Sequence, residues 1–176
     1  MLIGWVGASV LVLAIVVLFN RLVAARNQVR AAWSDIDVQL TRRHDLVPQL
    51  VAAVQGYAGH ERATLSLVAE LRARAMAAGS LRDKAQREDE LARQVQRVLA
   101  LQEAYPDLKS SDNFLALQRD LVAIEDHLQF ARRYYNGAVR DLNNRVETFP
   151  SMLVARAAGI GAAEFFRQGE GQEAPR

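Results

Sequence analysis

The sequence predicts an all-α protein: an N-terminal transmembrane helix that continues into an antiparallel up-down-up bundle of three long helices, followed by a short C-terminal helix. Residues 2–19 carry no charged side chain. Apolar residues then recur with a period of about 3.5, the seam of a left-handed helical bundle. β-branched residues become scarce after the first twenty positions, which argues against a sheet. If the second helix breaks at Gly79-Ser80, the bundle has four helices.

Length and composition exclude several classes of protein. A chain of 176 residues allows one modest domain and leaves no room for a TIM barrel. Without cysteine there is no disulfide framework, thiolate metal cluster or cysteine nucleophile. The 22 Lys+Arg nearly balance the 20 Asp+Glu, so the chain is not expected to bind nucleic acid.

The segment from Leu2 to Phe19 is predicted to span a membrane. At the helical rise it covers about 27 Å, close to the hydrocarbon thickness of a bilayer. Trp5 lies near one edge, where an indole prefers the headgroup boundary. A cleaved signal peptide is the alternative, with Val23-Ala24-Ala25 as the cleavage site. The absence of a basic side chain before the apolar run, and Arg21 before the cut, favour the anchor.

Charge predicts the orientation of this single-pass anchor. Arg21, Arg26 and Arg30 follow the span, so the positive-inside rule predicts an inner-membrane protein with its N-terminus outside and its bundle in the cytoplasm. The same arginines can attract anionic lipid, so membrane lipid is an expected partner.

The first soluble helix is predicted to continue directly from the anchor and to end near Gly56 and Gly59. Pro48 lies inside it and should kink it or loosen one turn. The seam consists of Leu22, Arg26, Val29, Trp33, Ile36, Leu40, Arg43, Val47, Leu50, Val54 and Tyr57.

The second helical stretch is expected from His60 to Tyr105, stopped by Pro106. Its seam loses register at Gly79-Ser80, so either one helix bends there or two helices meet there. The third stretch should begin at a cap among residues 110–112. Its seam consists of Phe114, Leu117, Leu121, Ile124, Leu128, Ala131, Tyr135, Ala138, Leu142, Arg145 and Phe149.

These elements predict four regions: an anchor over 1–20, a helical bundle over 21–149, a short C-terminal helix over 150–166 and a disordered tail over 167–176. The apolar residues after Pro150 are expected to fold back onto the bundle end or the membrane surface. The tail is polar and contains two glycines.

The search for catalytic, metal and cofactor motifs finds none that is complete. His60-Glu61 begins a zincin-like string, but Thr64 stands where the second histidine is needed. The Glu-x-x-His pairs of di-iron bundles are absent. Gly159-Ile-Gly161 lacks the third glycine and the preceding strand of a dinucleotide loop. We therefore expect no enzymatic activity, no cofactor and no small-molecule substrate.

The polar residues of the first helix have two interpretations. The side chain of Arg43, on an otherwise apolar seam, can pack its stem and pair with an acid such as Glu125 or Asp126 on another helix. It can instead contact a partner or a lipid headgroup. Asp35 and Asp37 are two residues apart and face away from each other, which is typical of a solvated face rather than of a metal site.

Three runs resemble the signature of the LemA family: RNQVRAAWSDIDVQLTRRHDLVP over 26–48, GYAGHE over 56–61 and EAYPDLK over 103–109. Tyr135-Asn136, Asn143 and Phe149-Pro150 match as well. The resemblance implies a membrane-anchored helical bundle with a short outside N-terminus and no established enzymatic activity. Among the family, one relative is implicated in building magnetosome membranes, and others are associated with membrane metalloproteases of the HtpX type.

A long heptad bundle on a single span, without a reaction centre, favours a scaffold or adaptor that forms a homo-oligomer or organises another inner-membrane protein. The resemblance suggests a membrane metalloprotease as one such protein. The alternative is a lipid-engaging element that remodels membranes through the basic juxtamembrane residues and the apolar 152–166 segment; a metal-dependent enzyme is a remote third. The polar signature residues can form an interaction surface or ties between helices. They are Arg26, Asn27, Asp37, Arg42, Arg43, Asp45, His60 and Glu61.

Overall fold

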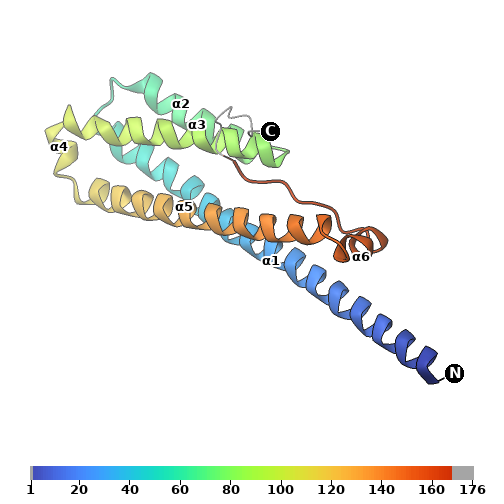
Figure 1. Ribbon diagram of the computed structural model, residues 1–176. Coiled ribbons are helices and arrows are strands. Elements are labelled where there is room, and N and C mark those ends of the chain that lie inside the picture. The colour runs from blue at the N-terminus through green and yellow to red at the C-terminus, as the bar shows by residue number, and fades with distance from the viewer. Residues whose placement is uncertain (1, 168–176) are drawn as a thin grey trace. The chain divides into compact units, whose positions relative to one another are not determined.

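The computed structural model describes residues 2–167, and these form helices and connecting segments without a strand. The all-α class predicted from the sequence is confirmed. The helices are α1 (Leu2–Gln55), α2 (Arg62–Met76), α3 (Leu81–Ala100), the 3-10 helix η1 (Leu101–Glu103), α4 (Pro106–Lys109), α5 (Asp112–Glu147) and α6 (Ser151–Ala157) (Figure 1).

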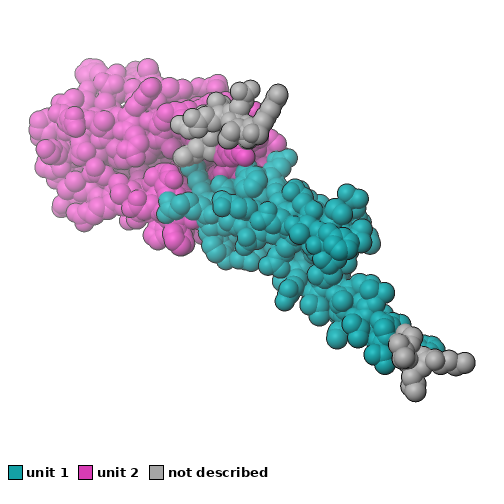
Figure 2. Space-filling view, in the orientation of Figure 1, with its two compact units in different colours: residues 1–35, 131–165 teal, residues 36–130, 166–176 magenta. Residues whose placement is uncertain are grey.

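The chain divides into two compact units (Figure 2). Unit 1 comprises residues 1–35 and 131–165, and unit 2 comprises residues 36–130 and 166–176. The long helices α1 and α5 each contribute residues to both units.

Unit 2 is a four-helix bundle, because the second helical stretch is broken at Gly79-Ser80. Ser80 caps α3: its Oγ accepts a hydrogen bond of 3.1 Å from the backbone N–H of Asp83. The two helices on either side of the break, α2 and α3, fold back on each other as a hairpin (Figure 1). As a result α5 runs antiparallel to α1, whereas a three-helix bundle would have made them parallel.

The core of unit 2 is built from the predicted apolar seams together with residues of the α2–α3 hairpin. Its fully buried side chains include Leu50, Leu91 and Phe114. The remaining members of this core are Val47, Val54, Ala58, Leu65, Val68, Leu71, Ala75, Val95, Val98, Leu99, Leu108 and Leu121.

Unit 1 pairs the first part of α1 with the end of α5. The Trp33 and Tyr135 rings meet edge to face with centroids 5.7 Å apart. Further along, a guanidinium Nη1 of Arg145 donates to the carbonyl oxygen of Arg21 at 3.5 Å. Since residue numbers fall on α1 as they rise on α5, the two segments are antiparallel.

The segment after α6 returns along α5 within unit 1. The side-chain amide of Asn143 donates to the carbonyl of Ala163 at 3.0 Å and accepts from its N–H at 2.8 Å. The Tyr135 hydroxyl donates to the carbonyl of Glu164 at 2.9 Å. These bonds hold the returning segment against the helix.

The C-terminal helix is shorter than the expected 150–166. Gly159, at φ 65°, adopts the left-handed conformation that ends α6. The N–H of Ile160 bonds the carbonyl of Ala155, and that of Gly159 bonds the carbonyl of Arg156, which completes a Schellman cap. The expected disorder over 167–176 lies outside the described residues, apart from Arg167.

The heptad seams fail only at their ends. Most seam positions are buried, but Tyr57 and Phe149 lie beyond the ends of α1 and α5 and are 46% and 72% exposed. Arg145, in the last turn of α5, is also exposed. Pro48 does not break α1, which continues to Gln55.

Candidate functional site

The first part of α1 exposes an apolar surface. Trp5 is 75% exposed and Phe19 43%, and large aliphatic side chains between them are similarly exposed. Leu2 begins the helix. In the described part of the chain, α1 is the one helix long and apolar enough to cross a membrane. Contiguous apolar exposure of this kind is typical of a surface that contacts lipid or another protein.

The basic residues after this segment differ in their exposure. Arg21 and Arg30 are exposed, as is Asn27, whereas Arg26 is half-buried. The exposed side chains of Arg21, Arg30 and Asn27 are available to lipid headgroups or to a partner.

A buried charge cluster joins α1, α3 and α5 in unit 2, and we define it as Arg43, His44, Glu88 and Glu125. Arg43 is 3% exposed; its Nη2 donates to Glu125 Oε2, and its Nη1 lies 3.6 Å from Glu88 Oε2. His44 Nε2 shares a hydrogen bond of 2.8 Å with Glu88 Oε1. Glu88 is fully buried, so the neighbouring Arg43 offsets the cost of burying its charge.

Pro48 connects α2 to the same cluster. A proline has no N–H, so the carbonyl of His44, four residues earlier, lacks its helical donor. Arg72 of α2 takes that place, and its Nε donates to the His44 carbonyl at 2.6 Å. The four helices of unit 2 therefore meet at one polar junction.

The other signature residues of unit 2 occupy more exposed positions. Asp37 pairs with Lys84 of α3 at 3.4 Å. Glu61, just before α2, accepts from the Tyr105 hydroxyl at 3.5 Å and from Thr64 at 3.4 Å. His60 is exposed. Glu61 is thus a tie between elements, while His60 is open to solvent.

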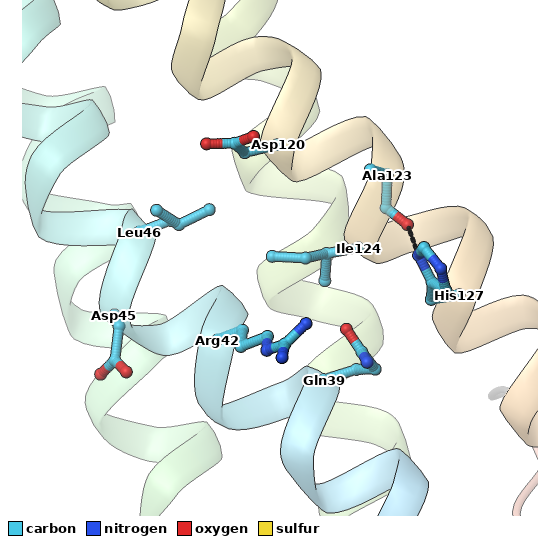
Figure 3. A pocket seen from close by; sticks show the side chains of 8 residues that line it. All are labelled: Gln39, Arg42, Asp45, Leu46, Asp120, Ala123, Ile124 and His127. Atoms are coloured by element: carbon cyan, nitrogen blue, oxygen red, sulfur yellow. Dashed lines mark hydrogen bonds between the residues drawn. The ribbon is translucent and has the colours of Figure 1, made fainter.

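Arg42 and Asp45 line a shallow groove between α1 and α5 in unit 2 (Figure 3). The groove has a volume of about 330 Å³. Figure 3 shows the Arg42 side chain lying between the helices beside Gln39. The remaining lining residues are Leu46, Asp120, Ala123, Ile124 and His127. We call this the α1–α5 groove.

The side chains of the cluster and the groove do not provide a set of metal ligands in the described part of the chain. Among the described residues, no group of three or more His, Asp or Glu is placed to hold a metal ion. The α1–α5 groove is lined by none of the four residues of the buried charge cluster. The cluster ties α1, α3 and α5 together, whereas the groove is a separate, open surface feature.

Sequence reasoning missed several of these roles. Glu88 lies in the polar run over residues 82–90, directly after the point where the apolar seam loses register, so nothing marked it as a core residue. The position of Pro48, four residues after His44, was the one local signal that a side chain from another helix was needed. Asp120 and His127 carry no signal in the sequence, because only the packing of α5 places them opposite α1.

The fold and these sites define a helical protein with one candidate membrane span followed by packed helices. Comparison with known proteins specifies it further: the model of the LemA family matches residues 32–176, and the chain belongs to that family.

Relatives of the chain carry two kinds of name. The magnetosome protein MamQ 2 of Paramagnetospirillum magneticum is 22% identical over 89% of this chain and 67% of its own length. Protein LemA of Metamycoplasma hominis is 26% identical over 86% of this chain and 69% of its own length. Neither name states an enzymatic activity.

Proposed function

We propose that the protein is a non-enzymatic, membrane-anchored scaffold that self-associates and so organises inner-membrane proteins. The observation that carries the proposal is α1 itself, one continuous helix that is exposed and apolar at its start and packed into a helical bundle at its end. The names of the relatives give a structure, the magnetosome, and no reaction. This favours an organising role over catalysis.

The α1–α5 groove is the surface best suited to self-association. It presents exposed charges of both signs, Arg42 on α1 and Asp120 on α5, and neither takes part in an ion pair among the described residues. In a two-fold symmetric dimer, a contact between two different residues of the two copies occurs twice, once in each direction. Arg42 of one copy would then face Asp120 of the second.

Exposed apolar side chains lie close to the groove in sequence on the same helices. Val38 and Val122 are each 47% exposed, and Phe130 is 66% exposed. An apolar surface beside complementary charges is typical of protein interfaces. These features favour a second copy of the chain over a small molecule as the occupant.

The test is the mass of the full-length protein in nanodiscs by light scattering. We expect a defined multimer for the wild type and dissociation for Arg42→Asp and for Asp120→Arg. The double variant, with its charges exchanged, should reassociate. Arg119→Asp changes an exposed residue of α5 that does not line the groove and is the matched control. A monomeric wild type would contradict self-association. A multimer that keeps its mass in Arg42→Asp, in Asp120→Arg and in the double variant would contradict the α1–α5 groove as the interface.

A further inference from the structure

The exposed end of unit 1 carries an apolar surface that the bundle does not use. Phe149 is 72% exposed and Leu153, in α6, is 55% exposed. Phe149 occupies the last position of the apolar seam, where a core side chain was expected. Two large apolar residues left exposed at a helix end indicate a contact outside the packed core.

Two hydrogen bonds fix where this surface lies along α1. Arg145 contacts the carbonyl of Arg21, the first charged residue after the apolar segment. Ser151, at the start of α6, donates to the carbonyl of Arg145 at 2.6 Å and so holds α6 against the last turn of α5. The last turn of α5 therefore contacts α1 directly after the apolar segment.

The antiparallel direction of α5 takes the chain further toward that segment. α5 continues for two residues beyond Arg145, to Glu147, which at the helical rise is about 3 Å. Measured along α1 from Arg21, this distance reaches the level of Phe19, the last apolar residue of the uncharged run. Phe149 follows just beyond the end of α5, and amphipathic surfaces that bind membranes bury their apolar side chains only roughly 5–10 Å deep.

Basic residues outnumber acidic ones in the segments that carry this surface. Arg21, Arg145 and Arg156 are exposed, with Asp141 and Glu147 as the exposed acids of the last turns of α5. Cationic side chains beside exposed apolar ones fit an anionic lipid surface. Two large apolar residues that follow α6, Ile160 and Phe166, are buried and are not part of this surface.

We propose that Phe149 and Leu153 form a shallow membrane contact of unit 1, beside the point where α1 leaves the bilayer, with Arg21, Arg145 and Arg156 facing anionic headgroups. This inference rests on the proposed membrane anchoring of α1. It gives unit 1 a second attachment to the lipid surface, separate from the span.

The absence of cysteine makes a direct test possible. Single-cysteine variants Phe149→Cys, Leu153→Cys, Val17→Cys and Ser34→Cys of the full chain are spin-labelled in nanodiscs of phosphatidylcholine and phosphatidylglycerol. Collision with oxygen, which concentrates in lipid, is compared with collision with a water-soluble nickel chelate. Val17 is the reference for the bilayer, and Ser34, exposed in unit 1 about 22 Å further along the helix than Phe19, is the reference for water.

We expect the oxygen-to-nickel ratio at positions 149 and 153 to be several-fold higher than at 34 and to approach the ratio at 17. A lipid-like ratio at 17 with water-like ratios at 149 and 153 would overturn the membrane contact and leave the anchor intact. A water-like ratio at 17 would overturn both. Spin–spin broadening at 153 would assign the surface to a second copy and overturn the lipid assignment.

Lipid charge tests the arginines separately. Without phosphatidylglycerol, the ratio at 153 should fall while that at 17 stays constant. An unchanged ratio at 153 would overturn the role assigned to the three arginines.

Discussion

Arg43 shows how one charged residue on an apolar seam can determine the packing of a bundle. Its guanidinium lies between Glu125 of α5 and Glu88 of α3, and it is almost inaccessible to water. Removing one partner of a buried ion pair leaves the other charge uncompensated, which costs far more than the loss of an exposed pair.

Arg43→Met should therefore lower the free energy of unfolding by about 3 kcal/mol, because it leaves Glu88 buried without its cation. Thermal and urea unfolding of the full chain in detergent, followed by circular dichroism, measures the loss. Arg93→Met, at an exposed position of α3, is the control and should change stability by no more than about 0.5 kcal/mol. Equal losses in the two variants would contradict a structural role for the cluster.

Tyr135 allows a prediction about pH. Burial raises the pKa of its hydroxyl above the usual 10, and the charge of Glu164 raises this pKa further. The phenol of the unfolded chain ionises first as the pH rises, so the stability contribution of Tyr135 is complete below about pH 10 and is lost as the pH rises toward the higher folded pKa.

Tyr135→Phe should cost about 1 kcal/mol near neutral pH through the lost bond to the carbonyl of Glu164. This difference from wild type should narrow above pH 10, where only the wild type loses stability through residue 135. Unfolding curves at several pH values measure it. Tyr134→Phe, which changes a half-exposed ring, is the control: its stability above pH 10 shows how much is lost through other groups that ionise at high pH. A difference that is constant with pH would contradict the role of the buried hydroxyl.

At the scale of elements, a proline in the middle of α1 supports the docking of another helix. Pro48 leaves the His44 carbonyl without a helical donor, and Arg72 of α2 supplies one. The expected effect of Pro48 was a kink or a loosened turn. In the tertiary structure a side chain fills the vacant hydrogen-bond position, and α1 continues to Gln55.

A double-mutant cycle tests this link. Arg72→Met should cost about 1–3 kcal/mol in the wild type, because the His44 carbonyl loses its donor from α2. In a Pro48→Ala background the cost should be smaller by about 1 kcal/mol, since the new N–H can bond that carbonyl. Arg74→Met removes an exposed pair with Glu70 and should cost less than about 0.5 kcal/mol in either background. If the effects of Arg72→Met and Pro48→Ala on the free energy of unfolding simply add, the link between Pro48 and Arg72 is contradicted.

The short loop between α2 and α3 determines the topology of unit 2, because it reverses the direction of the chain. The lost register at Gly79-Ser80 was visible in the sequence, but it was compatible with one bent helix or with two. Ser80 caps α3, and apolar residues on both sides of the loop share the core of unit 2. The hairpin buries both apolar faces, which a single straight helix could not do with these neighbours.

For the whole molecule, the decisive question is the orientation of the anchor. Positive-inside asymmetry predicts that residue 2 lies outside and the bundle lies in the cytoplasm. A membrane-impermeant maleimide should label Leu2→Cys in intact spheroplasts and should label Ser110→Cys only after lysis. Because the natural chain has no cysteine, each signal arises from one position. The reverse pattern would contradict the orientation, and labelling of both positions would contradict a sealed, single-pass arrangement.

The sequence by itself determined the all-α class, the uncharged segment of α1, the 3.5-residue seams and the family resemblance, because these depend on local periodicity and composition. Only the tertiary structure decided that α2 and α3 form a hairpin, that Glu88 and Arg72 complete a polar junction with His44, and that Asp120 and Arg42 line the same groove. The tertiary structure also leaves Phe149 exposed, although its position in the apolar seam predicted that it would be buried. These features depend on which helices meet, and side chains far apart in sequence acquire a common environment only when the helices pack.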